Sequence, residues 1–426
     1  MDFEKKESSY KILATVVITA FVTFIMTLYG ANYYYTKNDN KAKENLDKYI
    51  SLSALSGEMS LELSKDMEDL EGEIKISDAS KEVAVRIELV KRYIEENYLR
   101  EIDEAKLIES AVKGYVRGLG DLYTEYLTED EYAELMIDVN GNYVGIGIYM
   151  SQDKEGNIVI ITPIEGSPAE AAGLKSGDII VKVDGEECKG KDITITSNKI
   201  KGEEGTTVEL EIYRDGETFE TKIKRKTVVI NYIKSEVLEG NIGYIEILSF
   251  DGKSSSDFKK HYEELKSKKI KSLIIDVRDN GGGLVSEVIK IAEMIAPKGS
   301  ILMCTVDKDG NASETKSRTD DVMGIPIVLL VNEHSASASE ILAGALKDNK
   351  LATLVGTTTY GKGIMQELFK LKSGGAMKIT IQEFKTPNGD TIHDTGIEPD
   401  YVIEQPEDEE DNDVQLQKAI DILKGR

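Results

Sequence analysis

Three serines at alternate positions, Ser335, Ser337 and Ser339, stand where a hydroxyl could act as a nucleophile. They follow the apolar run 325–331, which predicts a buried strand, and the residues after them predict a helix. Catalytic groups of open α/β sheets collect at the carboxyl ends of strands, and a helix start offers free N–H groups to developing negative charge. The structural alternative is that Ser337 only caps the helix, because Ser337 and Glu340 have capping-box spacing. The pattern alone does not choose among the three serines.

A serine nucleophile needs a base, and Lys362, between Gly361 and Gly363, is the candidate. None of the three histidines lies in the sequence context of a catalytic triad. A lysine normally keeps its proton up to pH ~10.4, so Lys362 is either a desolvated base or an ordinary solvated loop residue. The flanking glycines would let the backbone pass close to another group. Residues 356–362 also match G-x-x-x-x-G-K of a phosphate-binding loop, although Gly363 stands where such loops carry serine or threonine.

These groups need a scaffold, and the sequence around them predicts two β-α-β units. The first consists of the apolar strand 271–278, the glycine-rich loop 279–283 and the helix 284–295. The second consists of the strand 325–331, the serine loop and its helix, and a further strand follows at 351–355. Continuous apolar strands that alternate with helices predict a mainly parallel, buried sheet. Both loops should then lie at the same edge of that sheet.

Upstream of this sheet the pattern changes twice. Apolar residues at helical spacing in 81–117 predict helices with core-facing stripes. Residues 118–127 predict a turn that leads into a short helix, and Thr128 and Glu131 have the spacing of a capping box at its start. From 143 to 228, short β runs and turns predict a separate β-rich region.

The β-rich region resembles a bacterial PDZ domain over its full length. A small-residue helix, a Gly-Asp turn and a strand ending in Asp-Gly occur in the family's order within 169–185. The resemblance implies a Gly-x-Gly loop whose N–H groups hold a free C-terminal carboxylate, with the peptide added as a strand at the sheet edge. The residues expected to form this site are Val144, Gly145, Ile146, Gly147 and Ile148. A groove facing the two isoleucines should prefer peptides with apolar C-termini.

Most of the chain resembles the carboxyl-terminal processing proteases, also called tail-specific proteases. The resemblance runs in order through roughly residues 85–403 and is carried by the motifs at 118–127, 276–283, 331–340, 343–348, 361–366, 386–389 and 396–400. It implies a serine peptidase in which Ser337 is the nucleophile, Lys362 the base and Gln366 the group that orients the lysine. On a straight strand Lys362 and Gln366 would lie ~13 Å apart, so residues 362–366 are expected to turn or coil.

The resemblance also implies an oxyanion hole, the set of N–H donors that receives the negative charge of the tetrahedral intermediate. It combines the N–H of Ala338 with one from the loop 281–283, so that each β-α-β unit supplies a donor from its own strand end. Gly282 and Gly283 are the candidates in that loop. The family often has Asn-x-Pro-Gly-Gly where this chain has Asp-Asn-Gly-Gly-Gly, and the choice of glycine stays open.

The composition and charge of the chain indicate which partners and which cellular location to expect. The formal net charge of −25 disfavours nucleic acid, whose phosphates would be repelled. Cys188 and Cys304 form no C-x-x-C motif, so no metal site is expected, and no cofactor is implied. Residues 12–36 form an uncharged run of 25 residues after three lysines, which is long enough to cross a bilayer. An uncleaved anchor is favoured over a cleaved signal peptide, and the rest of the chain should lie outside the cytoplasm.

The predicted fold class is an α/β catalytic core with a mainly parallel sheet, an inserted β-rich PDZ domain, an N-terminal helical region and one transmembrane helix. The expected segments are a cytoplasmic tail 1–11, anchor 12–35, stalk 36–80, helical region 81–139, PDZ domain 140–228, catalytic domain 229–403, and acidic spacer with C-terminal helix 404–426. The predicted function is a membrane-anchored serine endopeptidase that recognises protein C-termini and cleaves through an acyl-enzyme. Two alternatives are an inactive PDZ scaffold that binds protein tails and a P-loop nucleotide-binding protein. The family resemblance also suggests a homodimer, formed through residues 81–135 and the terminal helix.

Overall fold

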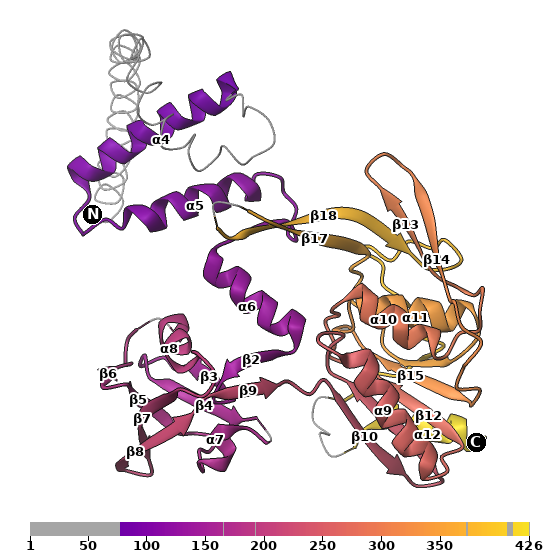
Figure 1. Ribbon diagram of the computed structural model, residues 1–426. Coiled ribbons are helices and arrows are strands. Elements are labelled where there is room, and N and C mark those ends of the chain that lie inside the picture. Colours follow the sequence, from indigo (N-terminus) through magenta and orange to yellow (C-terminus); the bar gives the residue numbers. More distant parts are fainter. Residues whose placement is uncertain (1–76, 165, 192, 372–373, 407–411, 426) are drawn as a thin grey trace, which may run out of the picture. The chain divides into compact units, whose positions relative to one another are not determined.

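The structure is a computed structural model, and it describes residues 77–425 except 165, 192, 372–373 and 407–411 (Figure 1). By its internal contacts the chain divides into two compact units, residues 1–102 and 103–426. The predicted anchor at 12–35 lies outside the described residues. Of the helices in the described part of the chain, none combines the length and the apolarity that crossing a bilayer requires.

Helices form in the N-terminal region as predicted, but their apolar stripes are not buried. The first unit contributes α4 (Asp78–Asn97), none of whose residues is buried. The second unit begins with α5 (Glu104–Arg117), in which only Val116 is buried. The prediction that the apolar stripes of these helices face a core is therefore wrong in the single chain. Helical spacing identifies an apolar face, but it does not say what covers that face.

A six-stranded sheet forms the centre of the catalytic part. Its strands in spatial order are β10 (Ile233–Leu238), β11 (Ile242–Ile247), β12 (Ser272–Asp276), β15 (Ile327–Val331), β16 (Thr353–Gly356) and β19 (Tyr401–Val402). Only the β10–β11 pair is antiparallel, which confirms the mainly parallel sheet. Every residue of β12 and β15 is buried, as their continuous apolar sequences predict.

Helices pack on both faces of this sheet (Figure 1). They are α9 (Ser254–Ser267), α10 (Val285–Glu293) and α11 (Ala338–Asp348) on one face and α12 (Val414–Leu423) on the other. Alternate strand residues divide between the two cores: Ile275 and Leu329 pack with the first three helices, and Ile274 and Val328 pack with α12. Since α12 covers a full face of buried strands, the C-terminal helix is part of the catalytic fold.

The catalytic part also contains a second sheet, which is antiparallel. Along the chain, its strands alternate with groups of strands of the first sheet. Its strands are β1 (Glu125–Leu127), β13 (Ile301–Asp307), β14 (Ala312–Lys316), β17 (Ile364–Lys370) and β18 (Ala376–Lys385). The strand β18 pairs with β1, β13 and β17, so it joins the N-terminal segment to the strand that follows Lys362.

The helix that follows β1 starts at the predicted position. In α6 (Glu129–Asn140) the N–H of Thr128 donates to Glu131 Oε2 at 2.9 Å, and the N–H of Glu131 donates to Thr128 Oγ1 at 3.3 Å. These two hydrogen bonds form the expected capping box. The helix leads directly into the β-rich insert.

The β-rich insert folds around a core of its own. Its elements are β3 (Ile148–Gln152), β4 (Ile158–Pro163), α7 (Pro168–Ala171), β5 (Ile179–Val183), β6 (Glu186–Glu187), α8 (Ile193–Ile200), β7 (Thr207–Arg214) and β8 (Glu217–Lys224). The linkers on either side pair as β2 (Asn142–Gly145) and β9 (Lys226–Val229). In the sheet order β3-β4-β5-β7-β8, strand β3 is an edge strand and can accept a further strand.

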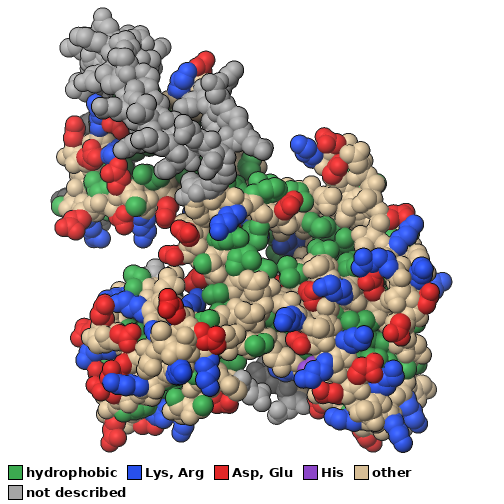
Figure 2. Space-filling model, in the orientation of Figure 1, with side chains coloured by type: hydrophobic (Ala, Val, Ile, Leu, Met, Phe, Trp, Pro, Cys, Tyr) green, Lys and Arg blue, Asp and Glu red, His purple; other side chains and the backbone are tan. Residues whose placement is uncertain are grey.

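Charged side chains are spread over the one face of the molecule that Figure 2 shows. On the face shown in Figure 2, acidic and basic side chains are interspersed, and neither sign forms a continuous patch. Ion pairs of this kind include Lys182 Nζ to Glu211 Oε2 at 2.7 Å on the insert. This face therefore has no basic surface of the kind that binds phosphate backbones.

Candidate active site

Ser337 is the accessible member of the three serines. Ser335 and Ser339 are fully buried, and their hydroxyls donate to the backbone carbonyls of Val277 at 2.7 Å and Asn280 at 2.8 Å. Ser337 is only partly buried and lies at the junction between β15 and α11. Of the three serines, Ser337 is therefore the one that burial leaves accessible.

The backbone of Ser337 differs from that of an ordinary helix cap. Its φ is +55° and its ψ is −110°, whereas a capping residue is normally extended. A non-glycine residue with positive φ is uncommon, and such strain concentrates at functional sites. The N–H of Ser337 does donate to Glu340 Oε2 at 2.9 Å, as the capping-box spacing predicts. Ser337 thus begins the helix in a strained conformation that turns the chain sharply after the strand.

Glu340 is a buried carboxylate that joins the serine loop to the lysine loop. Its Oε2 accepts the N–H of Ser337 at 2.9 Å and the N–H of Lys362 at 2.8 Å. Its Oε1 accepts the N–H of Gly361 at 2.7 Å and the hydroxyl of Thr359 at 2.6 Å. Because one oxygen atom contacts both nitrogens, the backbones of Ser337 and Lys362 are neighbours.

The side chain of Lys362 is half-buried, and its environment perturbs its charge. Burial lowers the pKa of the amine, and the nearby ammonium group of Lys378 lowers that pKa further. The carboxylates of Asp121, Glu125 and Glu340 oppose these effects. Burial thus favours the neutral amine that a base requires. Among the described residues, Lys362 Nζ makes no hydrogen bond with the Ser337 hydroxyl.

The glycines beside Lys362 allow the close approach that the sequence predicts. A Cβ atom at Gly363 would lie 2.4 Å from the backbone nitrogen of His393, and one at Gly361 would lie 3.1 Å from that of Gly396. The chain continues from Gly363 into the strand β17. A phosphate-binding loop requires a helix at this point, so the structure contradicts the nucleotide-binding alternative.

Gln366 lies on β17, after a bulge between Met365 and Gln366. The segment from Ile364 is therefore a strand with a local irregularity, and the expected turn or coil does not extend over it. The amide of Gln366 donates to Thr380 Oγ1 at 3.4 Å, and among the described residues it makes no hydrogen bond with Lys362.

The glycine-rich loop packs directly against Ser337. A Cβ atom at Gly282 would lie 2.9 Å from Cβ of Ser337 and 3.2 Å from the nitrogen of Ala338. The N–H of Gly282 already donates to Asn280 Oδ1 at 2.8 Å. Gly283 is exposed and bridges to Phe250, whose N–H donates to the Gly282 carbonyl at 2.9 Å. The N–H of Gly283 is not used by that bridge, so of the two candidate glycines it is the one available to an oxyanion.

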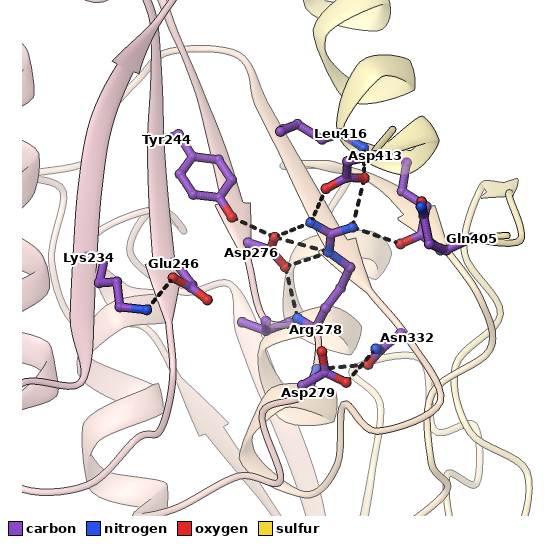
Figure 3. A network of polar contacts seen from close by, with 12 residues as sticks. Lys234, Tyr244, Glu246, Asp276, Arg278, Asp279, Asn332, Gln405, Asp413 and Leu416 are labelled. Atoms are coloured by element: carbon purple, nitrogen blue, oxygen red, sulfur yellow. Dashed lines mark hydrogen bonds and ion pairs between the residues drawn. The ribbon is translucent and has the colours of Figure 1, made fainter. Parts of the chain in front are cut away.

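A charged network fixes the strand that carries this loop (Figure 3). Arg278 Nη2 donates to Asp276 Oδ2 at 2.6 Å and to Asp413 Oδ2 at 2.7 Å. The hydroxyl of Tyr244 also donates to Asp276 Oδ2 at 2.8 Å. Asp413 is in turn the N-cap of α12, whose Leu416 N–H it accepts. The network thus anchors the C-terminal helix at the base of the glycine-rich loop.

Asp279 links the glycine-rich loop to the serine loop. Its N–H donates to Asn332 Oδ1 at 2.9 Å, and Asn332 Nδ2 donates back to Asp279 Oδ1 at 2.9 Å (Figure 3). The N–H of Asn332 donates to the hydroxyl of Ser335 at 2.9 Å. No local pattern in the sequence marks Asp279 and Asn332, because each finds its partner in a different β-α-β unit.

The expected peptide site of the insert is only partly arranged as the sequence suggested. Val144 and Gly145 belong to β2 and pair with β9. Ile146 is completely buried in the core of the insert, so it does not face a groove. Gly147 has φ +82° and packs against Ser167, and Ile148 opens the edge strand β3.

Glu340→Gln is expected to lower both stability and activity. The amide would turn an NH₂ group toward donors such as the N–H of Ser337 and Lys362, which leaves buried N–H groups unsatisfied. We expect a loss of about 3 kcal/mol in the free energy of unfolding and of about 10- to 100-fold in kcat/KM, measured by denaturant titration and by peptide cleavage. Glu287→Gln is the matched control, because Glu287 is also buried and accepts the N–H of Ser255 at 2.9 Å. That variant should lose stability and keep its kcat/KM; an equal kinetic loss in both would contradict the role given to Glu340.

The fold and the site define a class of protein: a serine hydrolase built on a parallel α/β sheet with an inserted peptide-binding module. Comparisons identify the family. The profile of peptidase family S41 matches residues 241–403, that of the PDZ domain matches 144–224, and that of the activating protease CtpB N-terminal domain matches 30–131. The chain belongs to the carboxy-terminal processing proteases of family S41, which are serine-type peptidases.

Two relatives with similar sequences illustrate this membership. The carboxy-terminal processing protease CtpA of Bacillus subtilis (strain 168) is 34% identical over 315 residues, 74% of this chain and 67% of the relative. A probable CtpA-like serine protease of Staphylococcus haemolyticus (strain JCSC1435) is 35% identical over 325 residues, 76% of this chain and 65% of the relative. The chain thus spans about two thirds of the length of these relatives. The solved photosystem II D1 C-terminal processing protease is 28% identical, with 75% of this chain and 86% of that chain covered and a TM-score of 0.44.

Proposed function

We propose that this carboxy-terminal processing peptidase cleaves peptide bonds with a dyad of Ser337 and Lys362. The observation that carries the proposal is the shared hydrogen-bond acceptor Glu340 Oε2, which holds the N–H groups of both residues. The accessible Ser337 and the desolvated Lys362 supply a nucleophile and a base of the required types.

In the proposed reaction the neutral amine of Lys362 removes the proton from the Ser337 hydroxyl as its oxygen attacks the substrate carbonyl carbon. The resulting oxyanion is stabilised by the N–H of Ala338, at the start of α11, and that of Gly283. The lysine ammonium group then protonates the leaving amine, and an acyl-enzyme remains. Water attacks the ester with Lys362 again as base, which restores the serine and releases the new C-terminus. Gln366 would orient the amine, which requires that it exchange its contact with Thr380.

The insert is proposed to select substrates by their free C-termini. The support is its match to the PDZ profile and the position of β3 at the edge of its sheet, where an extended peptide can add. The loop at Gly147 and Ile148 would face the carboxylate. Partly buried apolar residues beside the core, such as Met150, make an apolar C-terminal side chain the expected preference.

Cleavage of an unfolded protein with an apolar, free C-terminus by the full chain tests this function. We expect turnover of this substrate and at least about tenfold lower kcat/KM for the same substrate with an amidated C-terminus, because the carboxylate contacts are then lost. Equal rates for the two substrates would remove the proposed C-terminal selection. Binding without cleavage under all conditions would instead support the inactive scaffold.

The membrane anchor at 12–35, the extracytoplasmic location and the homodimer are part of the same proposal. The uncharged run supports the anchor. The exposed side chains of Ile108 and Tyr115 on α5 support a protein partner for this helix, since an amphipathic helix normally covers its apolar face. Light scattering of the purified full chain in detergent measures the number of copies.

A further inference from the structure

An aromatic ring from the N-terminal segment lies at the proposed base. Nζ of Lys362 lies 4.7 Å from the centroid of the Tyr123 ring. This separation is within the range in which a cation is attracted to the face of a ring. Tyr123 belongs to the 118–127 motif, and the proposed chemistry gives this residue no role.

The backbone around Tyr123 is held firmly, so the ring is placed by the fold. The N–H of Tyr123 donates to Asp121 Oδ1 at 2.9 Å, and the hydroxyl of Thr124 donates to Asp121 Oδ2 at 2.6 Å. Thr124 is buried, and its oxygen also accepts the N–H of Thr380 on β18 at 3.0 Å. The residues next in the chain form β1, which pairs with β18.

The hydroxyl of Tyr123 is not a second base. Burial and a hydrogen bond with the Tyr360 hydroxyl raise the pKa of Tyr123 to about 12. The phenol therefore stays neutral wherever a peptidase of this kind would work. Tyr123 therefore interacts with Lys362 through the face of its ring.

The ring acts on one protonation state of the lysine. A π face attracts an ammonium group and has little attraction for a neutral amine, so the contact favours the protonated form. The charged groups that face Lys362 come from three elements: Lys378 of β18, Asp121 and Glu125 of the N-terminal segment, and Glu340 of α11. The groups that face the Tyr123 ring are Asp394 and Tyr360. All of these groups remain when only the ring is replaced.

We propose that Tyr123 is a positioning residue for Lys362: its ring holds the ammonium form in the resting enzyme and so sets the pH at which the free amine becomes available to Ser337. The inference rests on the proposed function, because it assigns a role relative to the Ser337–Lys362 dyad. During the reaction the amine would leave the ring to reach the serine hydroxyl.

The test is the pH dependence of kcat/KM for the full chain. Activity of a lysine base rises as the amine loses its proton, and this rise is the acid limb of the profile. Tyr123→Leu keeps an apolar cover and removes the π face, so the ammonium loses a stabilising contact and its pKa falls. The limb should move to lower pH by about 0.5–1.5 units, which is a gain of about 3- to 30-fold in kcat/KM below the limb. Tyr123→Phe keeps the ring and should leave the limb in place.

A matched control is the contact between a tyrosine of α6 and a lysine of β17. The ring of Tyr132 lies 5.7 Å from Nζ of Lys370, so Tyr132→Leu removes a similar contact from a lysine without a catalytic role. Its limb should coincide with that of the wild type. Should Tyr123→Leu fail to fold, Tyr123→Met also lacks a π face and is read in the same way.

Two results would overturn the inference: a limb that does not move in Tyr123→Leu, or one that moves equally in Tyr123→Phe. Neither result concerns the dyad itself. Failure of the proposed function would appear separately, as cleavage that survives Lys362→Ala.

Discussion

Ser337→Ala is expected to reduce kcat/KM by at least about 10⁴-fold, because it removes the one accessible hydroxyl of the serine loop. Lys362→Ala should have an effect of similar size. The double variant should be no worse than either single variant, since a nucleophile and its base act as one unit and their losses do not add. The measurement is the release of a labelled fragment from an unfolded protein substrate with a free apolar C-terminus.

Two neighbouring side chains provide the controls for this result. Ser339→Ala removes a buried hydrogen bond to the Asn280 carbonyl, so it should cost about 1 kcal/mol of stability and less than about tenfold in rate. Lys370→Ala, on β17, should keep its activity. Cleavage that persists in both Ser337→Ala and Lys362→Ala would show that another pair of groups does the chemistry.

The sequence predicted the scaffold of this site well, because the scaffold depends on local patterns. The strands β12 and β15 are continuous apolar runs, and each is followed by a loop and a helix. Such units form a parallel sheet, which is enough to bring Ser337 and the glycine-rich loop to the same edge. The close approach of the backbone at Gly363 was also predictable from a local feature, because a glycine beside a functional residue indicates restricted space.

The contacts that define the site depend on tertiary packing and were not predictable. Glu340 has the spacing of a capping-box residue, and its first contact is indeed the N–H of Ser337. Its contact with Lys362, 22 residues away, depends on how the chain returns from β16. The pairing of Arg278 with Asp413 spans 135 residues and has no local signal at all.

Side-chain direction in irregular segments is also difficult to predict from the sequence. Ile146 was expected to line a groove, but it lies in a loop between two strands, where the alternation of strand residues does not apply, and it is buried. The amide of Gln366 contacts Thr380 across the bulge of β17. A bulge changes which side of the sheet a side chain faces, and its position cannot be read from these residues.

The segment just before β2 is attached to the glycine-rich loop through one short stretch of chain. Backbone atoms of Gly141 and Gly252 are in contact, and the N–H of Gly252 donates to the Val139 carbonyl at 3.0 Å. Two residues earlier, Phe250 exchanges backbone hydrogen bonds with the glycine-rich loop: its N–H donates to Gly282, and its carbonyl accepts from Leu284. The glycine-rich loop is therefore positioned from two sides, by the segment that precedes β2 and by Ser337.

Gly282→Ala is the second change expected to have a large effect. Its φ is +115°, a conformation that side chains rarely adopt, and its Cβ would lie 2.9 Å from Cβ of Ser337 and 3.0 Å from the Ala336 carbonyl oxygen. The loop must move away from the serine, and the N–H of Gly283 moves with it. Loss of one oxyanion donor typically costs about 10²–10³ in kcat, and we expect a loss of this size with little change in KM.

Gly281→Ala is the matched control for this prediction. A Cβ atom at Gly281 meets nothing within 4 Å, and its φ is not in the left-handed region, so the N–H groups of the loop should keep their places. The measurement is the steady-state kinetics of both variants with one peptide substrate. Gly282→Ala adds a methyl group that clashes with Ser337, whereas Gly281→Ala adds a methyl group without a clash. Because the donor acts on the charge that develops in the transition state, the loss in Gly282→Ala should appear in kcat. Equal kinetics for the two alanine variants would mean that the contact between Gly282 and Ser337 does not position an oxyanion donor.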